Sequence, residues 1–204
     1  MTPTTFWLIR HATVTPQALA LLYGQMDVPI CELRRAQDAP RYAALAQSLP
    51  RPAQWFVTPL SRTSLTAEAI MNAGYGPIAP RVEETLIEQD FGTWQGMRMD
   101  KFAERGARHP FWPVGGDEQP PDGESFAQLR QRVGAGLERL STDHEGEHVV
   151  AVSHGGAIRA AVAHALDLTA HQALSLAVEN LSVTRLERHD RAWRVVTVNE
   201  QISI

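Results

Sequence analysis

Short apolar runs bounded by polar residues mark the expected strands. Three of them, at 6–9, 54–57 and 148–152, each end abruptly at polar residues, as buried strands do. The β-branched residues at their centres favour the extended conformation. Two later runs, 182–186 and 193–198, flank the polar stretch 188–191. That arrangement predicts a β-hairpin near the C-terminus.

Amphipathic repeats between these runs predict helices. The clearest repeat places apolar residues at 126, 129, 133, 137 and 140, three or four residues apart. Weaker patterns predict helices over 41–49, 61–73 and 157–166. Strands that alternate with helices indicate an α/β fold, and we expect a three-layer α/β/α sandwich around a mostly parallel central sheet.

The 204 residues are enough for one ordinary domain, and we predict a single domain over residues 1–204. An insertion around 95–125 stands out because residues 106–123 are rich in proline and glycine and include Phe111 and Trp112. A loop of this length is usually functional or disordered. Exposed aromatic residues are costly, so we interpret the segment as a lid over a site.

Composition excludes several classes of protein. With 44% hydrophobic and 21% charged residues the chain is globular, and its net charge of −4 argues against a nucleic-acid partner. The single cysteine, Cys31, has no disulfide partner within the chain and is expected to be a buried, structural residue. Neither a signal peptide nor an apolar stretch long enough to span a membrane is evident. We therefore expect a cytoplasmic protein without a membrane partner.

Polar residues follow each of the three predicted buried strands. Arg10 and His11 end the first, Arg62 comes just after the second, and His154 follows the third. In open α/β sheets, ligands bind at the carboxyl ends of the strands. Arginine forks match phosphate oxygens, and the helix expected after Gly155 offers free N–H groups. Together these features predict an anion site.

The chain resembles the histidine phosphatase superfamily, also called phosphoglycerate-mutase-like proteins. Five segments carry the resemblance in the family's order: 8–12 (LIRHA), 58–68 (TPLSRTSLTAE), 86–96 (LIEQDFGTWQG), 121–126 (PDGESF) and 152–156 (VSHGG). A sixth, 23–30 (YGQMDVPI), is similar to the corresponding stretch of α-ribazole phosphatases. The resemblance implies a phosphoglycerate-mutase-like fold.

The resemblance also implies roles for individual residues. His11 would accept the phosphoryl group and Glu88 would donate the proton, with Asp90 and Glu84 as competitors for that role. The residues implied to surround the phosphoryl group or border the substrate are Arg10, Arg62, His154, Tyr23, Gly24 and Gly155.

The chemistry fits these residue types. An imidazole must be unprotonated to attack phosphorus, and the charges of Arg10 and Arg62, with any positive charge on His154, disfavour a second proton on His11. The same cations stabilise the charge on the phosphoryl oxygens, a task that other enzymes give to magnesium. We therefore expect no metal ion and no other cofactor.

The chain departs from the family pattern after His11. Ala12 stands where the family has glycine, which strains the turn if that position requires a positive φ. The Glu-Thr pair and asparagine that mutases carry next are missing, and with them an extra phosphate contact. His109 lies in the lid segment, where it could meet a substrate, but it is interpreted as a solvated loop histidine; the other histidines are interpreted as surface or packing residues. Arg34–Arg35 and the charges around Arg130–Arg132 are interpreted as solvated.

These expectations favour a metal-independent phosphomonoesterase that acts on a small phosphorylated metabolite through a phosphohistidine, with α-ribazole 5′-phosphate as one candidate. The alternatives are a cofactor-dependent phosphoglycerate mutase and a non-catalytic phosphate-binding regulatory protein. The sequence leaves the substrate open. It is compatible with a homodimer without deciding the oligomeric state.

Overall fold

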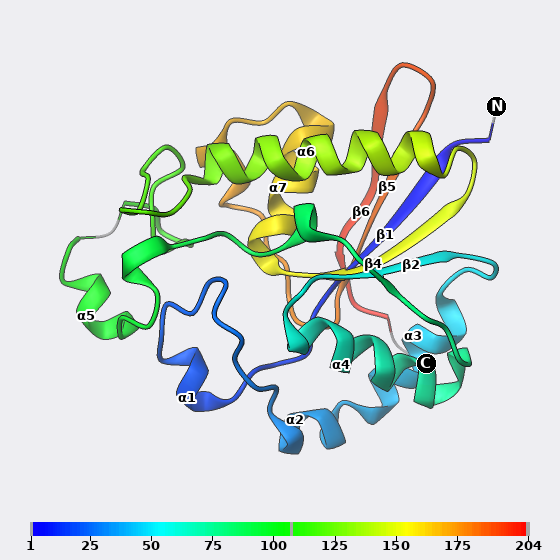
Figure 1. The fold of residues 1–204 in the computed structure, drawn as a ribbon, viewed down its shortest axis with the longest axis horizontal. Helices are drawn as coiled ribbons and strands as arrows, with labels where there is room; N and C mark the ends of the chain where they lie inside the picture. Colours follow the sequence, from blue (N-terminus) through cyan, green and yellow to red (C-terminus); the bar gives the residue numbers. More distant parts are fainter. Residues whose placement is uncertain (1, 107, 203–204) are drawn as a thin grey trace.

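A six-stranded mixed sheet crosses the middle of the molecule in the order β3-β2-β4-β1-β5-β6 (Figure 1). The computed structural model describes residues 2–106 and 108–202. The four strands from β3 to β1 are parallel, while β5 and β6 run antiparallel, as the hairpin prediction required. The bounds are β1 Thr4–Arg10, β2 Gln54–Val57, β3 Arg81–Val82, β4 His148–Ser153, β5 Val183–Arg188 and β6 Trp193–Glu200.

Helices cover both faces of this sheet. α6 (Phe126–Asp143) and α7 (Gly155–Leu166) lie on one side, and α3 (Ala39–Ser48) and α4 (Ser61–Ile70) lie on the other (Figure 1). The predicted α/β/α sandwich is therefore confirmed. The shorter helices are α1 Pro16–Leu19, α2 Glu32–Gln37, α5 Met99–Ala103 and α8 Ala170–Ala173, and further single turns are a π-type turn at Met71–Tyr75 and 3₁₀ turns at Glu84–Leu86 and Gly92–Trp94.

The apolar pattern explains the two best-predicted elements. Val149 to Val152 in β4 are at most 1% exposed because helices cover both sides of this central strand. α6 buries its apolar stripe against the sheet, with Phe126, Leu129, Val133 and Leu137 all at 0% exposure. Ser125 and Gln128 form a reciprocal capping box that fixes where α6 begins.

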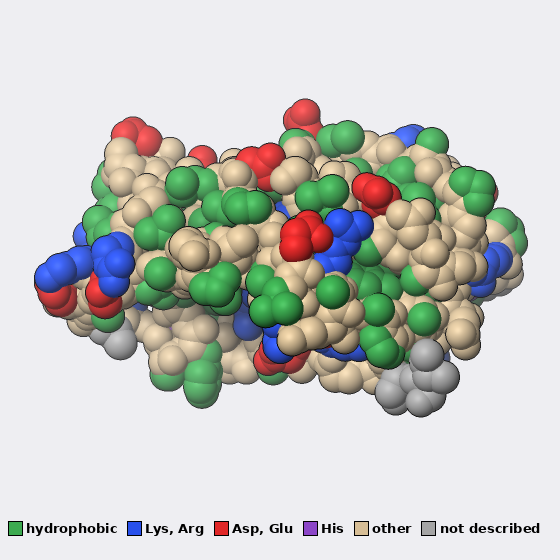
Figure 2. All heavy atoms as spheres, turned by 90° about the horizontal axis from the view of Figure 1, so that it is seen from below, with side chains coloured by type: hydrophobic (Ala, Val, Ile, Leu, Met, Phe, Trp, Pro, Cys, Tyr) green, Lys and Arg blue, Asp and Glu red, His purple; other side chains and the backbone are tan. Residues whose placement is uncertain are grey.

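Charged side chains are mixed with apolar ones on the face shown in Figure 2, and the basic groups do not gather there into one patch. Ion pairs at α5 and its ends include Lys101 with Glu104 and Arg98 with Asp100. Within residues 2–106 and 108–202, no helix has both the length and the apolar character needed to cross a bilayer.

Several local expectations are wrong. His109 is not solvated but only 4% exposed, because its ring packs on His171 at a centroid distance of 4.5 Å. Cys31 is half-buried rather than buried. The helix expected over 61–73 is α-helical over Ser61–Ile70 and continues as the π-type turn Met71–Tyr75, in which Gly74 leaves helical geometry at φ 118°. The burial of His109 depends on how distant segments pack, and the turn at Gly74 depends on backbone geometry. The periodicity of the sequence encodes neither.

Candidate active site

The carboxyl ends of β1, β4 and β2 meet at one edge of the sheet. β4 lies between the other two strands, and its register pairs Ser153 with Arg10 and Val152 with Val57. The backbone N–H of His11 donates to the Ser153 carbonyl oxygen at 2.9 Å. This topology brings together the residues that follow each strand, although they are separated by up to about 140 positions in the chain.

His11 is buried, at 1% exposure, and its ring is oriented by its own backbone. Nδ1 lies 2.7 Å from the Ala12 carbonyl oxygen, so Nδ1 carries the hydrogen and donates it. The lone pair of the neutral ring is then on Nε2. Burial lowers the pKa of His11 well below its ordinary value, and the charges of Arg62 and Arg10 lower it further. The imidazole is therefore neutral and available for attack at physiological pH.

Arg62 lies at the start of α4 with no exposed surface. Its Nη1 and Nη2 donate to the carbonyl oxygens of Met26 and Gly24, each at 2.7 Å, and its Nε donates to His154 Nδ1 at 3.3 Å. These bonds fix the guanidinium plane and still leave two of its five N–H bonds for another acceptor.

His154 is neutral, which corrects the expectation that it could add positive charge. Because its Nδ1 accepts from Arg62, its Nε2 carries the hydrogen and donates to Thr58 Oγ1 at 2.8 Å. Burial lowers its pKa well below the usual value, with Arg62, His11 and Arg10 adding to the effect. The ring lies 5.2 Å from that of His11, centroid to centroid.

Arg10 is half-buried and directs an unused donor into the site. Its Nη1 donates to the Val178 carbonyl oxygen at 2.6 Å. Its Nε is buried and has no hydrogen-bond partner among the described residues. A buried N–H without an acceptor is rare, and it marks a position that an anionic ligand can satisfy.

Glu88 is the carboxyl group of the site. It is 7% exposed, and its two oxygens accept backbone N–H bonds from Gln89 at 2.9 Å and from Gly156 at 3.1 Å. A Cβ at Gly156 would lie 2.2 Å from Glu88 Oε1, so only glycine permits this approach. The competing carboxylates lie elsewhere: Glu84 is exposed, and Asp90 accepts the N–H of Gly92 in a turn.

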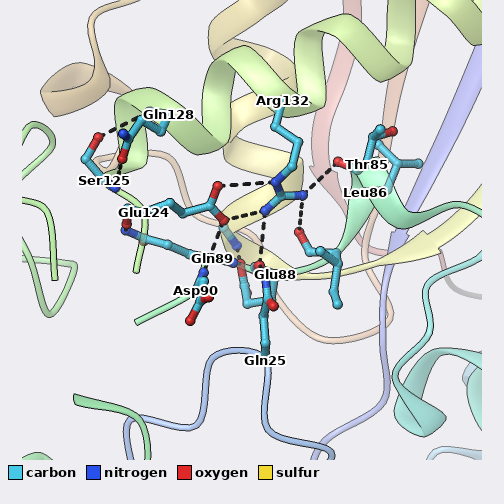
Figure 3. Close-up of polar contacts among 12 residues, drawn as sticks. Gln25, Thr85, Leu86, Glu88, Gln89, Asp90, Glu124, Ser125, Gln128 and Arg132 are labelled. Carbon is cyan, nitrogen blue, oxygen red and sulfur yellow. Dashed lines mark hydrogen bonds and ion pairs between the residues drawn. The ribbon is translucent and has the colours of Figure 1, made fainter. Parts of the chain in front are cut away.

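Arg132 holds the segment that carries Glu88, and this corrects its interpretation as a solvated charge. Figure 3 shows it extending from α6 to Glu124 and to the backbone that precedes and includes Glu88. It pairs with the Glu124 carboxylate and donates to the carbonyl oxygens of Thr85, Ile87 and Glu88 at 3.0 to 3.2 Å. Gln25 Nε2 also donates to the Glu88 carbonyl oxygen, at 2.9 Å.

Tyr23 and Gly24 lie against Arg62, and that they border the substrate stays a prediction. The guanidinium carbon of Arg62 lies 5.2 Å from the centre of the Tyr23 ring. Gly24 has φ 42°, and a Cβ there would lie 2.6 Å from Gln95 Oε1 and 2.8 Å from the Gln89 carbonyl oxygen. Glycine is required because the segment is both left-handed and tightly packed.

Ala12 does not adopt the positive φ that would have strained the turn. Its N–H donates to Thr66 Oγ1 at 2.9 Å, and that hydroxyl donates in turn to the Arg62 carbonyl oxygen at 2.6 Å. The alanine is accommodated, and Thr66 links the His11 turn to α4.

A cavity of about 200 Å³ opens beside these groups. Arg10, Glu88 and Gly155 form its polar wall, while the apolar wall includes Leu22, Phe91 and Trp112. The sequence interpretation did not include Arg159 of α7, which also lines the cavity. Its only signal was an arginine in an otherwise apolar helical run. Trp112 comes from the segment interpreted as a lid, and whether that segment moves stays a prediction.

Within the described part of the chain, no three His, Cys, Asp or Glu side chains gather in an arrangement that could hold a metal ion.

Comparisons with known proteins cover nearly the whole chain. The sequence model described as Histidine phosphatase superfamily (branch 1) matches residues 6–201. A metal-independent phosphoserine phosphatase of Arabidopsis thaliana is 32% identical over 193 residues, covering 91% of this chain and 77% of that protein. A probable phosphoglycerate mutase GpmB of an Enterobacter species is 30% identical over 189 residues, covering 92% and 86%.

Solved structures share the fold. A putative α-ribazole-5′-P phosphatase from Escherichia coli superposes with a TM-score of 0.81, covering 98% of each chain at 20% sequence identity. At that identity the likeness concerns the architecture alone.

Proposed function

The chain belongs to the histidine phosphatase superfamily, and from this premise we propose that it hydrolyses a small phosphomonoester through a phosphohistidine formed on His11. The observation that carries the proposal is the state of the His11 ring. Its Nδ1–H is donated to the Ala12 carbonyl oxygen, and burial with two nearby guanidinium groups keeps the ring neutral. An imidazole in this state is a nucleophile whose reactive atom is Nε2.

In the first transfer, Nε2 of His11 attacks phosphorus and the bond from phosphorus to the ester oxygen breaks. Glu88 gives its proton to the departing oxygen, which leaves as an alcohol. Arg10 and Arg62 stabilise the charge on the phosphoryl oxygens, and the unpartnered Nε of Arg10 is one of the donors. The Ala12 carbonyl oxygen continues to accept the Nδ1–H, which stabilises the charge that develops on the ring.

In the second transfer, water attacks the phosphorus and the bond to Nε2 breaks. Glu88, now a carboxylate, takes a proton from that water, which restores both residues and releases inorganic phosphate. Arg132 acts through Glu88 as a positioning residue, because it holds the backbone from Thr85 to Glu88. The chemistry requires no metal ion because guanidinium groups supply the positive charge.

Replacing His11 with alanine tests the proposal. We expect kcat for p-nitrophenyl phosphate to fall by about 10³-fold or more, since nucleophiles of this kind are not replaceable. His189→Ala is the matched control, because that histidine is exposed on the β5–β6 hairpin. Rapid quenching of the wild type should trap an acid-labile phosphoryl group that the His11→Ala variant lacks.

Equal turnover by the wild type and the His11→Ala variant would contradict the mechanism and leave a non-catalytic phosphate-binding role for the site. Activity that disappears with a chelator and returns with a divalent metal would indicate a metallohydrolase.

The name of the GpmB relative raises mutase activity as the second candidate. A mutase returns the phosphoryl group to bound product instead of water. Incubation with phosphoglycerates, with and without bisphosphoglycerate, separates the two. We expect release of inorganic phosphate, and isomer interconversion without release would reverse the assignment.

A further inference from the structure

The segment 178–182, between α8 and β5, is hydrogen-bonded to the residues at the end of β1. The Leu181 N–H donates to the Arg10 carbonyl oxygen at 2.9 Å. The side-chain amide of Asn180 lies 2.7 Å from the His11 carbonyl oxygen. A carbonyl oxygen only accepts hydrogen bonds, so the atom of Asn180 that faces it is the donor Nδ2. One loop therefore holds the backbone of both residues with which the active site begins.

The peptide that joins His11 to Ala12 is held at both of its polar ends. Asn180 donates to its carbonyl oxygen, and its N–H donates to Thr66 Oγ1 at 2.9 Å. His11 and Ala12 are at most 2% exposed, so water does not replace either partner without cost. Within residues 2–106 and 108–202, the only hydrogen-bond donor to the His11 carbonyl oxygen is Asn180. The orientation of this carbonyl group therefore depends on Asn180.

The orientation of the same peptide determines where the His11 ring points. The next carbonyl group along the chain, that of Ala12, accepts the Nδ1–H of His11 and leaves the lone pair on Nε2. Rotation of the peptide changes the ψ of His11 and the φ of Ala12, which moves the Ala12 carbonyl group relative to Nδ1. A displacement of about 1 Å at a reacting group lowers a rate by up to about 10²-fold.

Asn180 is itself fixed from outside the active site. Its own carbonyl oxygen accepts a hydrogen bond from Arg41 Nη2 of α3 at 2.7 Å, and the same nitrogen donates to Gln201 Oε1. The N–H of the preceding residue, Glu179, donates to Asn199 Oδ1 of β6 at 2.6 Å. The loop is thus tied to two elements that do not contribute to the active site, and its side chain approaches His11 from a fixed base.

The backbone of Leu181 has a left-handed conformation that a bulky residue rarely adopts. Its φ is 60°, and the residue is 1% exposed. Such a conformation costs free energy and persists only where the surroundings enforce it. It occurs where two successive groups, the Asn180 side chain and the Leu181 N–H, bond to the successive carbonyl groups of His11 and Arg10. The strain is therefore located where the loop holds the active-site backbone.

We propose that Asn180 is a positioning residue for the hydrolysis, which holds the His11 carbonyl oxygen so that the Ala12 carbonyl oxygen stays at Nδ1 and Nε2 stays directed at phosphorus. This inference rests on the proposed function and adds a residue that the sequence analysis did not single out. The cavity beside the site is lined by other residues, so Asn180 acts through His11 and not on the ester.

Asn180→Asp tests the proposal, because it keeps the shape of the side chain and replaces the Nδ2 donor with an acceptor. We expect kcat to fall by about 10- to 100-fold, for p-nitrophenyl phosphate and glycerol 1-phosphate alike, with KM changed by less than about threefold. Asn180→Ala removes the donor without adding a charge and should lower kcat by about tenfold, so the test does not depend on one variant. Circular dichroism verifies that both variants fold.

Asn199→Asp is the matched control, because it makes the same chemical change at a residue that holds the same loop. Aspartate keeps the oxygen that accepts the Glu179 N–H, and it tolerates the φ of 58° at this position. We expect kcat to stay within about twofold of the wild type. A loss of kcat common to Asn180→Asp and Asn199→Asp would show a general loosening of the loop and would overturn the inference.

The ring nitrogens of His11 give a readout that a purely structural role would not change. Nitrogen-15 NMR of histidine-labelled wild type should show hydrogen on Nδ1 and the lone pair on Nε2, and His11→Ala identifies the signals. In Asn180→Asp the bond from Nδ1 to the Ala12 carbonyl group should be weakened, so both tautomers should appear.

Three further results would overturn the inference while leaving the proposed function intact. These are an unchanged kcat in both Asn180 variants, a loss confined to KM, and a loss of kcat in Asn180→Asp with an unchanged His11 tautomer. Failure of the proposed function has a different signature, because hydrolysis of both esters would then survive His11→Ala.

Discussion

The two sides of the active site are built in different ways. On the phosphoryl side, His11, Arg62 and His154 are at most 1% exposed and follow or adjoin the ends of parallel strands. A continuous set of hydrogen bonds, from Arg62 through His154 to Thr58 and on to Thr63, fixes each group. The geometry that we propose for phosphoryl transfer is therefore part of the sheet's own packing.

The leaving-group side comes from segments without strands. Leu22 and Phe91 lie in loops. The Trp112 ring packs against Arg159, Phe91 and Phe126, and its Nε1 donates to Gln89 Oε1 at 3.0 Å. Its neighbour Phe111 is 68% exposed. We expect changes here to leave the sheet intact, so that selectivity would vary while the proposed chemistry stays constant. The following predictions test that division.

The largest effect is expected for Glu88→Gln, because Glu88 lies between the phosphoryl side and the leaving-group side of the active site. Glutamine cannot supply the proton, so hydrolysis of alkyl phosphates should fall by about 10²- to 10⁴-fold. p-Nitrophenyl phosphate should lose much less, since its leaving group needs little protonation. The measurement is kcat for both esters, with the exposed Glu84 changed to glutamine as the control. An equal loss for both esters would mean that Glu88 is not the proton donor.

Arg62→Lys should reduce kcat/KM by about 10²- to 10³-fold for alkyl and aryl esters alike. Lysine cannot replace the three donations to Gly24, Met26 and His154 together with a contact to phosphate. Arg130→Lys serves as the control, and circular dichroism verifies folding. A loss confined to one class of ester would break the division between the two sides.

Arg132→Met should lower kcat for alkyl phosphates by roughly tenfold, an effect of about 1.4 kcal/mol on the barrier. Without Arg132, the backbone from Thr85 to Glu88 loses three donations and the carboxyl group is less well placed. As for Glu88→Gln, kcat should fall more for alkyl phosphates than for p-nitrophenyl phosphate, but the difference between the two esters should be smaller. If the variant is merely less stable, with unchanged selectivity among esters, the positioning role is excluded.

Acid should destabilise the phosphoryl side. The pKa of His11 is lowered in the folded protein, so between that value and about 6.5 the unfolded chain binds more protons and stability rises with pH. The stabilisation is complete above the unfolded value and is lost as pH falls through the folded one. From pH 7.5 to 5.5, His11→Asn should lose about 1 kcal/mol less of its unfolding free energy than the wild type. Urea titrations at both pH values measure this, and parallel losses would contradict a neutral His11.

Much of this molecule was predictable from local patterns. The strand bounds at 54–57, the repeat of α6 and the hairpin all follow from periodicity, because a strand or helix with one buried face shows it in its own sequence. The polar residues after each strand indicated a shared anion site, because parallel strands end at one edge of a sheet.

Only the tertiary structure decided which residues far apart in the sequence are partners. By its sequence Arg132 is a charge on an amphipathic helix, yet it holds carbonyl groups more than 40 residues away. His154 is neutral because Arg62 and Thr58 occupy both its nitrogens. Arg159 is a lone charge in an apolar helix, and only the packing shows that it lines the cavity. Periodicity records which face of an element is buried, whereas hydrogen bonding and charge depend on which other segment that face meets.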